Sequence, residues 1–342
     1  MARPHHSRPV SRSEAWGAFA GRIPACVVRP GRALVGDGSG SRPRSPTGCP
    51  MTDLPADTLL HALAMDERVR IVACAATHAV AEGCRIQGTH PTASAAFGRL
   101  LAGSALLAAT LKGRERVTLQ IRGTGPLQWL LARSTPDGSV HGAVGQAAVH
   151  LPPRPDGKLD VGAAVGQGVL VVTRDLGIGE PWTGTVPLAT GEVGDDLAAY
   201  LLQSEQIHSA VGVGVLLRGE GEVTGAGGFL LQILGGLEDD EVDDLEAAIA
   251  GVRELARAFE GGMQPRELIH ALVGDDHRVL AERPLRYHCP HDAEHYRGRL
   301  LLLGHAALEE LLSEQPDLRV RCEFSQREYC YTRADFPELD RD

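Results

Sequence analysis

Two short segments near the C-terminus form an incomplete zinc-binding pattern, which strongly limits how this part of the chain can fold. The first segment is Cys289-Pro-His291 and the second is Cys322-Glu-Phe-Ser325. Two tight turns that each carry two zinc ligands have this spacing. Here His291 fills the second position, and Ser325, which is not a usual zinc ligand, fills the fourth. If zinc binds, it supplies most of the folding free energy of so small a module.

The size and charge of the chain argue against several classes of protein. Its 342 residues, 43% of them hydrophobic, are enough for one large core or two domains. A net charge of −10 argues against a nucleic-acid partner. The longest apolar run, Leu100 to Leu111, is interrupted by Gly103 and Ser104 and is too short to cross a bilayer. Seven irregularly spaced cysteines favour a protein of the reducing cytosol over a secreted disulfide scaffold.

Residues 1–50 differ in composition from the rest of the chain. They are rich in Arg, Pro, Gly and Ser, and their only acidic residues are Glu14 and Asp37. No apolar periodicity is sustained there, so we expect this segment to be disordered. We interpret it as a non-native extension ahead of a translation start at Met51, and an organelle transit peptide is the alternative.

Residues 51–236 show a mixed pattern of helices and strands. We expect a helix from Asp53 that carries Leu59, Leu60 and Leu63, and a long helix over 92–111 that starts after Pro91. Alternating apolar residues and turn signals predict strands. The predicted strands cover 69–76, 116–122, 129–133, 169–173, 211–217 and 223–229, and a further helix covers 192–206. Because strands and helices do not alternate regularly, the pattern indicates an α+β fold whose β-rich core domain is packed with helices.

The composition changes after Gly235-Gly236. A helix is predicted over 237–259, because acidic residues crowd its start and apolar residues then recur at helical spacing. A second helix is predicted from Pro265 to Leu272. We interpret 237–284 as a helical linker, 285–336 as a small module of the zinc-binding type, and 337–342 as a tail.

One enzyme motif is present in the module. His291-Asp-Ala-Glu294-His295 fits the H-x-x-E-H pattern of a zinc metallohydrolase, with two imidazoles one helical turn apart and Glu294 as the general base. The match is short, and little chain follows it to build a substrate cleft. No nucleotide-binding motif and no catalytic group of residues occurs elsewhere, so we expect a protein that is not an enzyme.

Many segments of the chain match, in order, those of one protein family. They are Phe97–Leu100, Leu111–Gly113, Gly123–Leu127, Leu159–Gly162, Val165–Gly168, Asp175–Gly177, Gly191–Glu192, Tyr200, Ser204–Gln206 and Gly227–Gln232. Over residues 53–336 the chain resembles the heat-shock protein 33 family, the redox-regulated holdase chaperones of the bacterial cytosol. The resemblance implies a homodimer that binds unfolded or partly folded client proteins without ATP under oxidative or heat stress and assists their later refolding.

The resemblance also implies a switch in the C-terminal module. In the family, C-x-C and C-x-x-C hold zinc, and oxidation forms two disulfides, releases the metal and unfolds the linker. By position, Cys289 and Cys322 match two of the four cysteines, whereas His291 and Ser325 replace the others, so neither family disulfide can form. We therefore expect the redox control to be altered. A non-chaperone interaction protein on the same fold is a further alternative.

A nearby cysteine could replace the missing ligand. In a hairpin whose loop is centred on Ser325 to Arg327, Cys330 would lie opposite Cys322, within disulfide range. We predict that Cys322 and Cys330 act together, either as ligands of a zinc site formed by Cys289, His291, Cys322 and Cys330 or as a new disulfide, with Cys289, Cys322 and Cys330 as the redox-active residues. Zinc is the expected cofactor.

Overall fold

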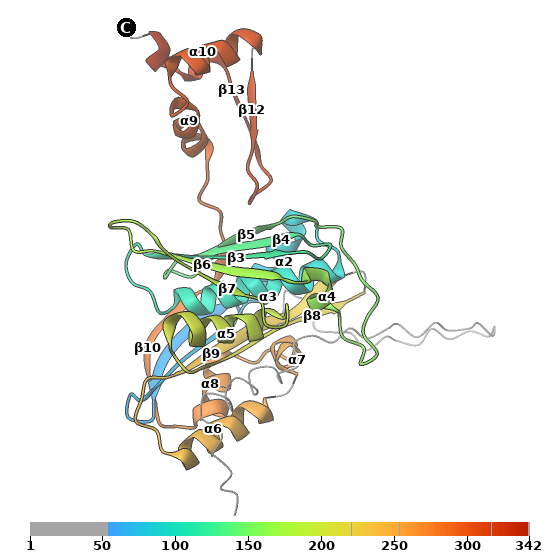
Figure 1. Ribbon diagram of the computed structural model, residues 1–342, viewed down its shortest axis with the longest axis vertical. Helices are drawn as coiled ribbons and strands as arrows, with labels where there is room; N and C mark the ends of the chain where they lie inside the picture. The colour runs from blue at the N-terminus through green and yellow to red at the C-terminus, as the bar shows by residue number, and fades with distance from the viewer. Residues whose placement is uncertain (1–53, 220, 253, 316, 341–342) are drawn as a thin grey trace, which may run out of the picture. The chain divides into compact units, whose positions relative to one another are not determined.

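The computed structural model describes residues 54–219, 221–252, 254–315 and 317–340. The expectations for 1–50 lie outside these residues. The chain forms two compact units, one that ends at Tyr287 and one that begins at His288. Both contain helices and strands, which confirms the α+β prediction (Figure 1). No helix in the described ranges is long and apolar enough to cross a membrane.

Two sheets form the frame of the first unit. The five-stranded sheet has the order β10-β1-β2-β9-β8, and the six-stranded sheet has the order β11-β5-β4-β3-β6-β7. Neighbouring strands are antiparallel except for the short β11–β5 pair, which is parallel. The strands are β1 (Thr58–Ala64), β2 (Val69–Ala75), β3 (Arg116–Gly123), β4 (Trp129–Ser134), β5 (Ser139–Val144), β6 (Gly168–Asp175), β7 (Trp182–Pro187), β8 (Ser209–Arg218), β9 (Glu222–Ile233), β10 (His277–Pro284) and β11 (Arg286–Tyr287).

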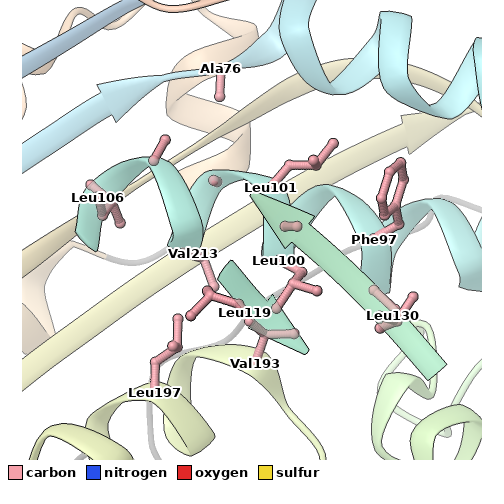
Figure 2. Packing of buried hydrophobic residues seen from close by; sticks show 14 of the residues in the cluster. Ala76, Phe97, Leu100, Leu101, Leu106, Leu119, Leu130, Val193, Leu197 and Val213 are labelled. Carbon is pink, nitrogen blue, oxygen red and sulfur yellow. The ribbon is translucent and has the colours of Figure 1, made fainter. Parts of the chain in front are cut away.

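Helices fill the space between the two sheets (Figure 1). These helices are α2 (Thr77–Gln87), α3 (Pro91–Ala108), α4 (Val161–Val165) and α5 (Val193–Glu205). The helix α3 begins with Pro91 at a position that needs no N–H donor, and its remaining residues are all buried. Figure 2 shows Phe97, Leu101 and Leu106 of α3 packed with residues of both sheets. Such a fully buried helix explains the Ala- and Leu-rich pattern over 92–111.

Three further helices cover the outer face of the five-stranded sheet. They are α6 (Asp239–Gly251), α7 (Leu255–Glu260) and α8 (Pro265–Val273). Strand residues on this face form a second apolar cluster with the helices. We call these strand residues the linker face: Leu60, Ala62, Ala64, Val69, Ile71, Ala73, Ala75, Ala210, Phe229 and Leu231. The helices contribute Leu245, Ile249, Leu255, Phe259, Leu268, Ile269 and Leu272. The five-stranded sheet is therefore apolar on both faces.

The helix α7 lies unusually close to the sheet because glycines line the strands below it. A Cβ atom on Gly225 would come within 2.2 Å of the Ala256 carbonyl oxygen, and one on Gly214 within 3.0 Å of the Ala256 Cβ. A Cβ on Gly227 would lie 2.4 Å from the Phe259 ring. Only glycine allows this approach of a helix to a strand.

The structure corrects three expectations about the first unit. The segment with Leu59 and Leu60 is the strand β1 and not a helix. Both leucines are buried, on opposite faces of a sheet covered on both sides, and such a strand lacks the alternation that identifies strands in a sequence. The expected helix over 237–259 is divided into α6 and α7, with Glu254 in the left-handed conformation (φ 57°). The end of the expected helical linker is the strand β10, paired with β1.

The second unit is a small module of two helices and one hairpin. It contains α9 (Ala293–Leu301), α10 (His305–Glu314), β12 (Leu318–Arg321) and β13 (Glu328–Tyr331), followed by short 3₁₀ turns at Arg333–Asp335 and Pro337–Asp340. Its apolar cluster consists of Leu308, Leu318, Tyr331, Phe336 and Leu339. Because Leu339 is part of this cluster, the module extends into the region expected to be a tail.

Candidate metal and redox site

Two turns of the C-terminal module bring together Cys289, His291 and Cys322. Cys289 and His291 precede α9, whose first turn is capped by Asp292, since the Asp292 carboxylate accepts a hydrogen bond from the His295 N–H at 2.8 Å. Cys322 directly follows β12. Its N–H donates to the Arg327 carbonyl at 2.8 Å, and its own carbonyl accepts from the Gln326 N–H at 2.9 Å. A tight turn therefore bends around Cys322.

The distances at this site suit a zinc ion. The Cys289 and Cys322 Sγ atoms are 3.7 Å apart. Tetrahedral zinc with Zn–S bonds of about 2.3 Å holds two sulfur ligands about 3.8 Å apart. One ligand atom from each of Cys289, His291 and Cys322 lies within 4.8 Å of the others. The donor set of two thiols and one imidazole is a common zinc set.

Hydrogen bonds to the sulfur of Cys322 favour its thiolate form. Burial raises the pKa of this thiol, but donors around the sulfur outweigh burial and hold the pKa below its ordinary value. These donors are the hydroxyls of Ser325 and Tyr296 and the backbone N–H groups of Ser325 and Phe324. The Ser325 N–H lies 3.4 Å from the sulfur.

The pKa of the second thiol, Cys289, is shifted in the opposite direction. Burial, together with a negative charge on Cys322, raises the pKa of Cys289 to about 11, against the lowering effect of the His291 N–H. The first proton therefore leaves Cys322, and the second is much harder to remove. A bound dication would remove this penalty, because a coordinating thiol is deprotonated.

Aromatic rings enclose the site on the His291 side. The His291 ring lies 5.2 Å from the Phe324 ring and is stacked on the His295 ring at 4.4 Å. The Tyr329 hydroxyl donates to the His291 carbonyl at 2.9 Å and so connects β13 to the first turn. The sequence analysis missed Tyr296, which belongs to no recognisable motif and approaches Cys322 only through the fold of the module.

Cys330 does not lie where the sequence analysis placed it. The hairpin forms, but its register pairs Cys330 with Arg319 and places Cys322 opposite Arg327. The turn starts directly after Cys322, earlier than expected, so the two thiols are not cross-strand partners. The Cys330 thiol is exposed and donates to the Asp317 carboxylate at 3.5 Å. The hydroxyl of Ser325, in contrast, is directed at the two sulfurs.

The geometry does not support the hydrolase motif. His291 precedes α9, so His291 and His295 do not lie on one helix as the motif requires. Glu294 is largely exposed and faces Arg297, with 3.4 Å between the charged atoms. His291 lies with the two cysteines instead.

Comparison with known proteins identifies the family. A family model described as "Hsp33 protein" matches residues 57–332. The chain belongs to the Hsp33 family. It is 37% identical to the 33 kDa chaperonin of Bacillus subtilis over 284 residues, which are 83% of this chain and 98% of the relative. It is 40% identical to the 33 kDa chaperonin of Geobacter sulfurreducens over 285 residues, 83% of this chain and 94% of the relative.

A solved structure agrees with this assignment. The crystal structure of the 33 kDa chaperonin (heat shock protein 33 homolog) of Thermotoga maritima matches with a TM-score of 0.75 and 33% identity. The match covers 83% of this chain and 98% of the Thermotoga maritima chain. The resemblance inferred from the sequence is thereby confirmed, and the Hsp33 fold extends over both sheets, the linker helices and the C-terminal module.

Proposed function

We infer that this Hsp33-family protein is an ATP-independent holdase chaperone of the cytosol, which binds unfolding proteins, prevents their aggregation under oxidative or heat stress and so allows later refolding. The observation that carries this proposal is the linker face. A sheet that is apolar on both faces has one face covered by α3 and its neighbours and the other only by α6, α7 and α8. Release of these helices would expose a broad apolar surface to a client.

The linker helices have little stability of their own. They are 13, 6 and 9 residues long, and isolated helices of this length are marginal in water. Their polar contacts with the rest of the unit include partly exposed ion pairs, in which Arg68 binds Glu241 of α6, Arg218 binds Glu260 of α7, and Arg266 of α8 binds Glu282 of β10. Such surface pairs contribute at most about 1 kcal/mol each. Apolar burial against the linker face therefore dominates their attachment.

We also propose that Cys289, His291 and Cys322 bind zinc, with the fourth position taken by the Ser325 hydroxyl or by water. When bound, zinc would hold the two turns of the module together. The chain runs from α8 through β10 and β11 directly to Cys289, so a change in the module reaches the linker by continuity of the backbone. Cys330 is outside the proposed ligand set because of the hairpin register.

Aggregation of a chemically unfolded enzyme, followed by light scattering without ATP, tests the proposed function. We expect the activated protein to suppress this aggregation, and we expect the suppression not to depend on nucleotide. A protein that leaves light scattering unchanged, whether reduced, metal-depleted or oxidised, would favour an interaction protein that kept only the fold. The proposal includes a homodimer, which light scattering coupled to size-exclusion chromatography would measure as twice the mass of the chain.

A further inference from the structure

We propose that oxidation of this protein forms one disulfide between Cys289 and Cys322, and that this bond fastens the C-terminal module instead of unfolding it. Neither the bond nor the fastening of the module depends on the proposed chaperone function. The sulfurs are already in contact at 3.7 Å and need to move by only about 1.7 Å to reach the S–S bond length.

The surroundings of the two thiols favour this pair over the other cysteines of the described chain. Cys330 is exposed on the far strand, with its thiol at the Asp317 carboxylate. Cys74 and Cys84 are buried in the first unit. The turn around Cys322 and the capped start of α9 hold the two sulfurs face to face.

The reaction is balanced with a hydroperoxide as the oxidant. One of the two cysteines attacks the peroxide as a thiolate, becomes a sulfenic acid and releases the alcohol, or water from hydrogen peroxide. The other thiol then attacks the sulfenic sulfur and releases water. Two thiols lose two electrons and two protons, and the peroxide is reduced.

The position of the bond determines its effect. It would join the turn before α9 to the turn after β12, so the closed loop contains α9, α10 and β12. Leu308 and Leu318 of the apolar cluster lie within this loop. A disulfide within either turn would close only a few residues and leave the two turns free to separate. The cross-link restricts the unfolded module and so opposes its unfolding.

Peptide mapping of the full-length protein tests the bond directly. Trypsin separates the three cysteines of the module into the peptides 287–297, 322–327 and 328–333. After removal of metal and treatment with hydrogen peroxide, we expect peptides 287–297 and 322–327 to appear as one species, lighter than their sum by two hydrogen atoms. Cys330→Ser retains this species and Cys289→Ser loses it.

Limited proteolysis of the same samples tests the consequence. We expect cleavage within 288–340 to be at least fivefold slower in the oxidised protein than in the metal-free reduced protein. A bond between Cys322 and Cys330, irreversible oxidation of Cys289, or bonds between chains would overturn the pairing. Faster cleavage after oxidation would overturn the fastening. These results do not depend on client binding, so a failed disulfide and a failed chaperone function are distinguishable.

Discussion

A single methyl group added to the strand beneath α7 tests whether the linker helices control access of clients to the linker face. In Gly225→Ala the new Cβ would lie 2.2 Å from the Ala256 carbonyl oxygen and 2.8 Å from the Glu260 nitrogen, both in α7. Ordinary contact begins at 3.4 Å, so α7 must retreat by about 1.2 Å (3.4 − 2.2). Overpacking of this kind costs about 1–3 kcal/mol. Such a cost shifts the balance between attached and released linker by about 5- to 150-fold.

We expect Gly225→Ala to suppress client aggregation without an activating treatment and to bind more of an apolar dye than the wild type. The matched control is Gly228→Ala in the same strand. Its Cβ would meet the Gly212 carbonyl oxygen at 2.4 Å and Leu106 of α3 at 3.3 Å, on the opposite face of the sheet. The control should lose thermal stability without gaining activity.

Two results would refute the reasoning. One is an equal gain of activity in Gly228→Ala, because general destabilisation would then explain both variants. The other is an inactive Gly225→Ala in which hydrogen exchange shows α7 detached, because release of the linker would then be insufficient for client binding.

Other predictions concern the linker and the metal site. Leu268→Ala, in α8, removes a fully buried side chain at a cost of about 2–5 kcal/mol and should activate the chaperone at lower temperature, whereas the equally buried Leu100→Ala should lower only the melting temperature. The hydrogen bond from Arg218 lowers the pKa of Glu260. This ion pair therefore stabilises the attachment of α7 above about pH 4.5, and the stabilisation is lost as the pH falls through the lower pKa of the folded state. Dye binding should rise in acid before α3 loses its amide protection. Purified protein should hold one zinc per chain by elemental analysis, Cys289→Ser should hold much less, and equal zinc contents in the two proteins would exclude the site.

Much of the fold could be predicted from sequence because local patterns agree with the tertiary structure. The helix α3 and the strands β3, β4 and β6 lie where apolar periodicity and turn residues placed them. The prediction of a helix at β1 was wrong because both faces of this strand are buried, which removes the alternation of apolar and polar residues that identifies a strand. The division between α6 and α7, where Glu254 adopts the left-handed conformation, was missed because no local pattern in the sequence reveals it.

The candidate site could be predicted only in part. The spacing of Cys289, His291 and Cys322 identified the three residues that the structure brings together. Whether Cys330 joins them depends on hairpin register, and a small shift of the turn changes every pair across the two strands. The hydroxyls at Cys322 come from Ser325 in the turn and Tyr296 in α9, and the second contact requires the complete module.

Hydrogen exchange during client capture tests the central claim most directly. Backbone amides of α6, α7 and α8 should lose their protection when the protein becomes active, and amides of the linker face should become protected again when a client binds. Amides of α3 should stay protected throughout. Full suppression of aggregation with residues 239–273 still protected would contradict the account, because the client would then be bound elsewhere.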